Sequence, residues 1–301
     1  MTTTQSAPNL PVALIRAMRP RQWAKNVLVF AAPLAAGALF NADVFWPTIG
    51  AFIVFCLISS ATYLINDVRD VASDREHPTK RERPIAAGHL PVGIAVTTAA
   101  FLALIALIAA YLINPPLAGV VAIYAVFTLA YSLMLKHEPV IELALLAMGF
   151  LLRAIAGAVA SDLPISQWFL IVAGFGSLFM AAGKRFSELH RLTNDESALK
   201  ANTRKVLDGY TLNYLRFVWA VSAAVAIMGY CLWAFDVAQT PSSFPWAEWS
   251  VLPFVLAVLR YAVVIDRGDA EAPEDAALGD RVLLVLGALW VVMFGLGAFG
   301  L

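Results

Sequence analysis

Residues 44–74 read VFWPTIGAFIVFCLISSATYLINDVRDVASD, a long apolar run that ends abruptly in polar side chains. Residues 44–65 carry no charge, and the run is as long as a helix that crosses a bilayer. Residues 66–74 then bring three aspartates and an arginine within nine positions. The stretch predicts a membrane-spanning helix with a functional cluster at one end.

The rest of the chain repeats this apolar pattern. Of its 301 residues, 60% are hydrophobic and only 14% charged, whereas soluble domains are about a quarter charged. We predict nine spans, at residues 27–41, 44–65, 91–113, 116–135, 140–160, 165–186, 210–235, 249–265 and 282–300. The sequence therefore predicts an all-α integral membrane protein that forms a single polytopic domain over residues 1–301.

The distribution of Lys and Arg predicts the orientation of these spans. Every second connection lacks both residue types: those near 42–43, 114–115, 161–164 and 236–248. The other connections and the segment before the first span carry nearly all of the 21 Lys and Arg residues. Because cytoplasmic loops are enriched in Lys and Arg, we expect a plasma-membrane protein with a cytoplasmic N-terminus and an outside C-terminus. The long loops at 66–90, 187–209 and 266–281 are then cytoplasmic.

Residues 1–26 form the cytoplasmic N-terminal segment, and its last part mixes arginines with Leu, Ile, Met and Trp. That composition fits a helix lying in the membrane interface, and it fits a simple orientation signal equally well. The net charge of zero gives no bulk electrostatic case for nucleic acid. We therefore expect the lipid bilayer and no nucleic acid as a partner, and a homo-oligomer stays open.

The aspartates of the polar cluster are spaced for metal binding. Asp67, Asp70 and Asp74 stand at i, i+3 and i+7, which share one face of a helix. Carboxylates that close repel one another unless a cation lies among them, and Mg²⁺ favours carboxylate and phosphate oxygens. Asn66 adds an amide for a metal-bound water or a phosphate oxygen. We predict a Mg²⁺ site on these aspartates, with Asp67 and Asp70 as catalytic residues; the alternative is a solvated helix end neutralised by nearby arginines.

A basic loop follows within a few residues. Residues 77–84 read HPTKRERP, and their two prolines keep the stretch non-helical. Lys80 and Arg83 are side chains suited to phosphate, so we predict that they bind substrate. The alternative is that they only signal topology. Carboxylates and cations at one cytoplasmic mouth together predict chemistry on a diphosphate at the membrane surface.

These residues resemble a known family. Residues 66–74, followed by RPIAAG at 83–88, resemble the first signature of the UbiA superfamily of intramembrane prenyltransferases, NDxxDxxxD followed by RPI. The resemblance covers essentially the whole chain. It implies nine transmembrane helices around a central cavity, with Mg²⁺ on the diphosphate of the substrate.

One departure from the family narrows the expectation. Members typically carry a second Asp-rich motif on the next long cytoplasmic connection, but residues 183–189 read GKRFSEL here. With residues 19–26, 135–142 and 259–263, the last together with Glu274 and Asp275, this resembles an actinobacterial branch that makes decaprenyl-phosphoryl-5-phosphoribose. The branch implies Mg²⁺-dependent transfer of 5-phosphoribosyl from phosphoribosyl diphosphate to decaprenyl phosphate, with release of diphosphate, for synthesis of cell-wall arabinan precursors.

Under this resemblance the remaining site residues receive roles. Lys184 and Arg185 hold either the 5-phosphate or the lipid phosphate, and Glu188 accepts a ribose hydroxyl or joins the metal shell. Lys25 and Lys136 are further phosphate-binding candidates, and Tyr63 faces the cavity or packs between helices.

Two other functions stay open. One is UbiA-type prenyl transfer from a prenyl diphosphate to an aromatic or lipid acceptor. The other is a membrane transporter, which needs ionisable groups near the middle of the bilayer, where Arg153 is the best candidate.

Overall fold

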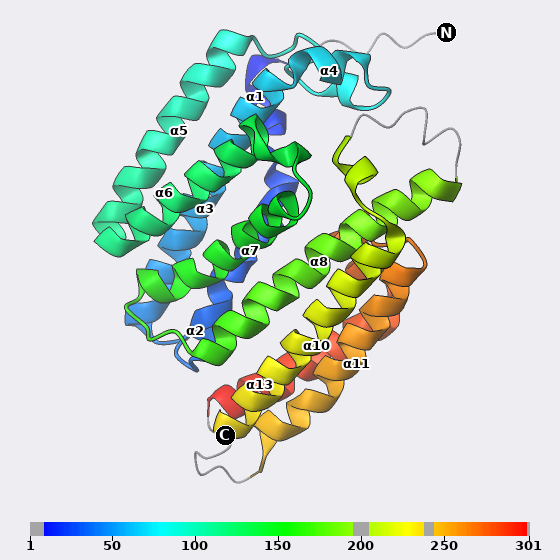
Figure 1. Ribbon diagram of the computed structural model, residues 1–301. Helices are drawn as coiled ribbons and strands as arrows, with labels where there is room; N and C mark the ends of the chain where they lie inside the picture. The colour runs from blue at the N-terminus through cyan, green and yellow to red at the C-terminus, as the bar shows by residue number, and fades with distance from the viewer. Residues whose placement is uncertain (1–8, 195–204, 238–243, 300–301) are drawn as a thin grey trace, which may run out of the picture.

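The chain folds into a bundle of long helices (Figure 1). The computed structural model describes residues 9–194, 205–237 and 244–299, and within these ranges all regular structure is helical. The predicted all-α architecture is therefore confirmed. Parts of the predicted segment 1–26, of the loop 187–209 and of the connection 236–248 lie outside the described residues, as does the end of the last predicted span.

Eight described helices are long and apolar enough to cross a membrane. They are α3 (Ala42–Arg69), α5 (Val92–Ile113), α6 (Pro115–Leu133), α7 (Ile141–Ala160), α8 (Gln167–Asn194), α10 (Leu212–Val237), α11 (Trp246–Asp266) and α13 (Arg281–Ala298). Each matches a predicted span within a few residues at most ends. The exceptions are the motif-bearing ends of α3 and α8, which continue to Arg69 and Asn194 because the polar residues there stay helical.

The first predicted span, 27–41, has a different structure. It overlaps η1 (Pro20–Phe30), a 3₁₀ helix, and the short helix α2 (Ala31–Ala35). A 3₁₀ helix rises about 2.0 Å per residue, so η1 and α2 together extend about 30 Å, the thickness of a hydrocarbon core. Figure 1 shows this segment running from α1 at one end of the bundle to α2 at the other. The first predicted span is thus the end of a 3₁₀ helix followed by a short α-helix.

Close packing against α7 explains the path of η1. A Cβ on Gly157 of α7 would lie 1.8 Å from the carbonyl oxygen of Val29, so only glycine permits this approach. Four residues earlier on α7, Arg153 donates from Nε to Oδ1 of Asn26 in η1 (2.8 Å). It also donates to the hydroxyl of Tyr124 on α6 (2.7 Å). The intramembrane Arg153 therefore joins η1, α6 and α7 by hydrogen bonds that offset the cost of its burial.

Short helices connect the long ones. α1 (Leu10–Met18) buries Ala13 and Ala17 against the bundle and exposes Leu10, Val12 and Ile15. Such a helix at the end of the bundle favours the interfacial interpretation of this segment over a bare orientation signal. The other connecting helices are α4 (Val71–Glu76), η2 (Lys80–Glu82), η3 (Leu135–His137), η4 (Lys205–Gly209) and α12 (Pro273–Gly279).

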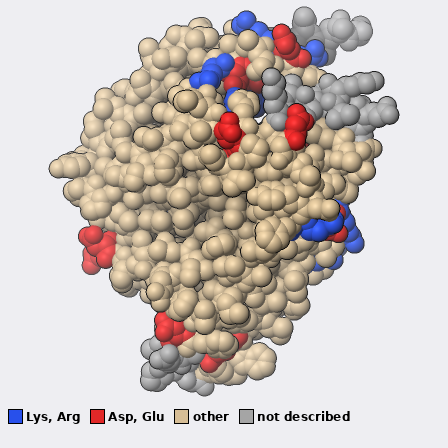
Figure 2. All heavy atoms as spheres, in the orientation of Figure 1, with Lys and Arg blue, Asp and Glu red and all other residues tan. Residues whose placement is uncertain are grey.

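The outer surface is largely apolar. Figure 2 shows charged side chains gathered toward the rim of the molecule and a broad area without charge between them. Large apolar side chains are exposed along the long helices; Phe101 and Leu112 of α5 are 63% and 77% exposed. A surface this apolar suits lipid rather than water, so the protein is an integral membrane protein.

Candidate active site

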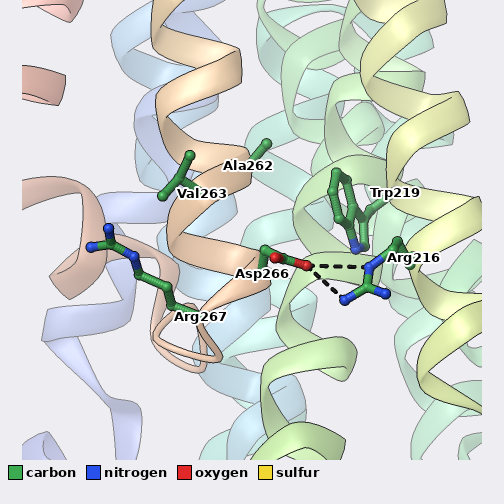
Figure 3. A pocket seen from close by; sticks show the side chains of 6 residues that line it. All are labelled: Arg216, Trp219, Ala262, Val263, Asp266 and Arg267. Atoms are coloured by element: carbon green, nitrogen blue, oxygen red, sulfur yellow. Dashed lines mark hydrogen bonds and ion pairs between the residues drawn. The ribbon is translucent and has the colours of Figure 1, made fainter.

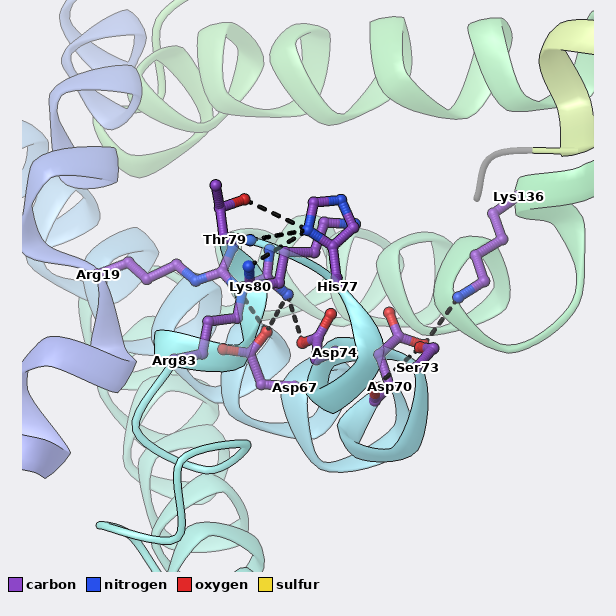
Figure 4. A network of polar contacts seen from close by, with 10 residues as sticks. All are labelled: Arg19, Asp67, Asp70, Ser73, Asp74, His77, Thr79, Lys80, Arg83 and Lys136. Carbon is purple, nitrogen blue, oxygen red and sulfur yellow. Dashed lines mark hydrogen bonds and ion pairs between the residues drawn. The ribbon is translucent and has the colours of Figure 1, made fainter. Parts of the chain in front are cut away.

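The aspartate motif spans a break between two helices. α3 ends at Arg69, and the backbone of Asp70 (φ −86°, ψ 7°) leads directly into α4. Because the helix is interrupted, the three carboxylates do not continue along one straight face as their spacing predicted. Figure 4 shows Asp67 and Asp74 beside Arg83, whereas Asp70 extends toward Lys136. The motif therefore presents a pair of carboxylates and a separate third one.

One arginine joins the pair. Nη1 of Arg83 lies 2.7 Å from Oδ2 of Asp74 and 3.2 Å from Oδ1 of Asp67. Arg19, at the start of η1, makes a second ion pair to Oδ1 of Asp67, and its guanidinium lies 5.1 Å from the ring centre of Tyr63. Both aspartates are buried, at 2% and 3% exposure, while the arginine side chains keep about a quarter of their surface open. Two cations thus lie between the buried carboxylates and the solvent.

The third aspartate binds the connection between α6 and α7. Nζ of Lys136, in η3, lies 2.9 Å from Oδ1 of Asp70. Both side chains are partly exposed, at 25% and 22%. The structure therefore brings the predicted candidate Lys136 to the aspartate motif from 66 residues away in sequence.

The same connection is strained further along. Val140 has φ 68° and ψ −51°, and the N–H of Ile141 donates to the carbonyl of Pro139 (2.8 Å), which closes a γ-turn of the rarer kind. A β-branched residue in this conformation costs about 1–3 kcal/mol. The hydroxyl of Tyr210 accepts the N–H of Val140 at 2.7 Å and so holds the turn. This turn sets the position of Glu142, two residues later, at the start of α7.

A second charged cluster surrounds Arg185. Its guanidinium donates to both carboxylate oxygens of Glu142, each at 2.8 Å, and to Oε2 of Glu188 at 2.6 Å. A longer contact of 3.3 Å reaches the hydroxyl of Tyr131. Arg185 is 2% exposed and Glu142 is fully buried, whereas Glu188 keeps 15% of its side chain exposed. The predicted phosphate contact of Arg185 stays a prediction, and the structure shows a guanidinium that orients Glu188.

The other predicted residues lie around these two clusters. The carbonyl of Asn66 accepts the N–H of Asp70 at 2.9 Å and ends α3, while its side chain is half-buried. Lys25, Lys80 and Lys184 are half-buried as well. The structure thus places Lys80 in the network of Figure 4 and leaves the substrate contacts of all three lysines as predictions.

His77 shapes the basic loop. Its Nδ1 accepts the backbone N–H groups of Thr79 and Lys80, both at 3.3 Å. Burial, with the charge of Lys80 added, lowers the pKa of His77 below its ordinary value. A neutral imidazole keeps Nδ1 available as an acceptor, so the histidine stabilises the turn that carries Lys80.

Three residues of these clusters were not predicted as site residues from the sequence: Arg19, Glu142 and Tyr131. Arg19 opens the stretch 19–26 and Glu142 closes the stretch 135–142, and the resemblance of both stretches to the actinobacterial branch was the available signal. Its left-handed backbone (φ 57°) and its ion pair with Asp67 depend on tertiary structure. Glu142 and Tyr131 take their roles from α8, more than forty residues away.

The carboxylate oxygens of the aspartate motif form only part of a binding site for a divalent cation. Among the described residues, no three carboxylate, histidine or cysteine side chains converge on one point. Oxygens of Asp67 and Asp74 both lie within 3.2 Å of one nitrogen of Arg83, so a cation already occupies the position between them. Mg²⁺ binds such oxygens at about 2.0–2.1 Å and retains other ligands from water or phosphate. Two buried carboxylates therefore fit Mg²⁺ once Arg83 turns toward solvent, and Asp70 fits only after leaving Lys136.

These features define a class: an integral membrane protein whose helical bundle places buried acids and several cations at one end, an arrangement suited to phosphorylated substrates. The model of the UbiA prenyltransferase family matches residues 27–286. The chain belongs to the UbiA prenyltransferase family, as the sequence motifs predicted.

Curated relatives narrow the comparison. A decaprenyl-phosphate phosphoribosyltransferase from Corynebacterium glutamicum is 50% identical over 95% of this chain and 87% of its own length. The protein of the same name from Mycobacterium tuberculosis is 48% identical over 99% of this chain and 98% of its own. A solved UbiA homologue from Archaeoglobus fulgidus, bound to DMAPP and Mg²⁺, superimposes with a TM-score of 0.70 over 95% of this chain and 99% of its own. Because the two sequences are only 16% identical, this match supports the fold and gives no argument about function.

Proposed function

We propose that this protein transfers the 5-phosphoribosyl group of phosphoribosyl diphosphate to decaprenyl phosphate, releases diphosphate and uses Mg²⁺. The observation that carries the proposal is the balance of charge at the motif. The aspartates of the motif meet Arg19, Arg83 and Lys136, which come from three separate elements. A site that handles a donor and an acceptor that are both phosphates needs this many cations. The two relatives of about 50% identity carry the name of the same reaction.

The donor diphosphate binds at the buried pair. Asp67 and Asp74 would hold Mg²⁺, with Asp70 as a further ligand, and Asn66 would bond a water of the ion or a phosphate oxygen. When bound, the ion supplies Lewis-acid neutralisation of the diphosphate. Arg83 and Arg19, released from the carboxylates, donate to the diphosphate oxygens, and Tyr63 keeps Arg19 in place.

The reaction is a substitution at C1 of the ribose. The C1–O bond to diphosphate breaks and its electron pair leaves with diphosphate, while the ring gains oxocarbenium character. An oxygen of the lipid phosphate attacks C1 from the opposite face, so the anomeric centre inverts. A general base is unnecessary, because a phosphate monoester is already ionised at pH 7. The cations of the site stabilise charge as it develops on the leaving group.

The second cluster recognises the rest of the substrates. Glu188, oriented by Arg185, accepts a ribose hydroxyl. Lys80, Lys136 and Lys184, with Lys25 at η1, bind the 5-phosphate and the phosphate of the lipid. The polyprenyl tail then lies in the predicted central cavity, between helices open to the bilayer.

The proposed cellular setting follows from the charge pattern. The N-terminus and the active site face the cytoplasm, where a soluble donor is available, and the C-terminus lies outside the plasma membrane. The product would then serve the synthesis of cell-wall arabinan precursors.

One alternative has an observation in its favour. The family model that matches residues 27–286 is that of the UbiA prenyltransferases, so prenyl transfer from a prenyl diphosphate is the second candidate. A transporter is disfavoured, because Arg153 is bonded to Asn26 and Tyr124 between helices and has a structural role.

A transfer assay separates the two enzymes. Purified protein is incubated with Mg²⁺, decaprenyl phosphate and phosphoribosyl diphosphate labelled in the ribose, and the lipid fraction is counted. We expect label in the lipid, and none when geranyl diphosphate labelled in the prenyl group and an aromatic acceptor replace the two substrates. Labelled product only in the second reaction overturns the proposal in favour of prenyl transfer.

A further inference from the structure

The connection between α6 and α7, residues 134–140, joins the two charged clusters of the site. Near its start, Nζ of Lys136 lies 2.9 Å from Oδ1 of Asp70 in the aspartate motif (Figure 4). Two residues after its end, Glu142 accepts two hydrogen bonds from Arg185, each at 2.8 Å. A displacement of this one connection therefore moves a charged group in each cluster.

The connection ends in a strained turn at Val140. Its φ of 68° and ψ of −51° belong to the rarer kind of γ-turn, which a β-branched residue disfavours. The valine side chain is 54% exposed, so burial of that side chain does not hold the turn. The backbone N–H of Val140 instead donates to the hydroxyl of Tyr210 at 2.7 Å. The turn is therefore held from outside, by the segment that leads into α10.

That segment has a fixed position. Tyr210 is 6% exposed and packs in one buried apolar cluster with Leu143 of α7 and Phe186 of α8. The residue before it, Gly209, lies so close to Pro139 that a Cβ would be 2.4 Å from Cγ of the proline ring. Only glycine permits this approach. The hydroxyl of Tyr210 and the contact of Gly209 thus fix the turn at two adjacent points.

The start of α10 is joined to its neighbours as well. Nε and Nη2 of Arg216 donate to Oδ1 of Asp266 on α11, at 3.2 and 2.8 Å, and Figure 3 shows these two side chains meeting between the helices. The guanidinium of Arg216 lies 5.4 Å from the ring centre of Phe186 on α8. Tyr210, two residues before α10, therefore has a rigid base from which to hold the turn.

We propose that Tyr210 is a positioning residue for the transfer reaction. Its hydroxyl holds the Val140 turn in the strained conformation that places Glu142 against Arg185. Tyr210 therefore acts through the backbone of the connection and needs no contact with a substrate. Without the hydroxyl, Val140 relaxes to a negative φ, because the hydrogen bond that offset the strain is lost. The inference rests on the proposed function, in which the second cluster recognises the ribose of the donor.

Kinetics of the purified full-length protein test the inference, with phosphoribosyl diphosphate varied at saturating decaprenyl phosphate. Tyr210→Phe removes the hydroxyl and keeps the ring, and we expect the KM for phosphoribosyl diphosphate to rise about five- to tenfold. We expect kcat to change by less than about twofold, because Arg19 and Arg83, which neutralise the leaving group, are not part of the connection. Tyr214→Phe is the matched control: its exposed ring stacks on Tyr210 with the centres 5.9 Å apart, and loss of its hydroxyl should change neither constant.

A rescue separates positioning from general stability. Glycine adopts a positive φ without strain, so Val140→Gly keeps the turn formed when the hydroxyl is absent. The KM of the double variant Tyr210→Phe with Val140→Gly should return to within about twofold of the wild-type value. Hydrogen exchange followed by mass spectrometry measures the turn itself, without substrate. Exchange at Ile141 and Glu142, whose N–H groups bond within the connection, should be about threefold or more faster in Tyr210→Phe and return to the wild-type rate in the double variant.

Four results decide against the inference. A wild-type KM in Tyr210→Phe shows that the hydroxyl does not position the site. A lower kcat with an unchanged KM, which Val140→Gly does not restore, assigns Tyr210 to the stability of the fold alone. Wild-type exchange at Ile141 and Glu142 in Tyr210→Phe shows that the turn does not depend on the hydroxyl. A wild-type protein without phosphoribosyl transfer overturns the proposed function and this inference with it, whereas the first three results leave the proposed function intact.

Discussion

Variants of Glu142 and Arg185 separate two roles of the second cluster. Glu142→Ala alone tests how far the buried ion pair stabilises the fold, and the double variant with Arg185→Met tests whether Arg185 positions Glu188 for catalysis. The carboxylate is fully buried and makes both of its bonds to Arg185, which is itself 2% exposed. Without Glu142, Arg185 stays buried with Glu188 as its remaining carboxylate. Breaking a buried pair from one side costs about 3–5 kcal/mol. We take the lower part of this range, about 3 kcal/mol, because Glu188 still compensates the guanidinium at 2.6 Å.

Thermal unfolding in detergent, followed by circular dichroism, measures this cost. Glu142→Ala should lower the Tm clearly, while Glu138→Ala, an exposed glutamate of the same connection, should leave it unchanged. The double variant Glu142→Ala with Arg185→Met removes the buried charge as well, and apolar replacements of buried pairs are often neutral. Its Tm should therefore return close to the wild-type value.

The transfer kinetics of the double variant then test whether Arg185 positions Glu188. In the double variant Glu188 loses the guanidinium that orients it, so we expect the KM for phosphoribosyl diphosphate to rise at least about tenfold despite the recovered stability. Wild-type KM and kcat in the double variant would refute the positioning of Glu188 by Arg185. A wild-type Tm in Glu142→Ala would refute the buried ion pair itself.

Three other perturbations test separate parts of the structure. Asp67→Ala should lower transfer at saturating Mg²⁺ by at least about 100-fold while the protein still elutes as a folded species from gel filtration; near wild-type turnover counts against the metal assignment. NMR titration should give His77 a pKa below about 6.5, and because its pKa is lowered, the loop should lose stability as the pH falls below that value; a higher pKa contradicts the acceptor role of Nδ1. Gly157→Ala should destabilise the protein by about 1–3 kcal/mol through its clash with Val29, whereas Gly119→Ala, with open space around it, should not; equal Tm values would contradict the packing of η1.

Local sequence pattern predicted the eight α-helical spans well, because each is a long apolar run bounded by polar residues. The described residues contain eight helices long and apolar enough to cross a membrane, where the sequence predicted nine spans, and the first predicted span, 27–41, has a 3₁₀ structure that was not predicted. That structure depends on the contact between Gly157 and Val29, which are 128 positions apart and which no local propensity relates.

In the candidate site, too, local sequence pattern predicted some features, whereas others depend on contacts between residues far apart in the sequence. The pattern at 66–74 indicated a functional cluster, and Lys136 was selected as a candidate that the structure then places on Asp70. The helix break at Asp70 was not predicted, since an i, i+3, i+7 spacing is equally compatible with one continuous helix. The partner of Arg185 was not predicted either, because the rotation of α7 against α8 decides whether Glu142 meets it.

The position of the donor diphosphate tests the account most directly. A structure of the protein with phosphoribosyl diphosphate and Mn²⁺, a stand-in for Mg²⁺ that anomalous scattering locates, would show it. We predict the ion between Asp67 and Asp74, with Arg83 turned from the carboxylates onto the diphosphate. A diphosphate bound at the other end of the bundle, or bound with no ion beside these aspartates, would contradict the account.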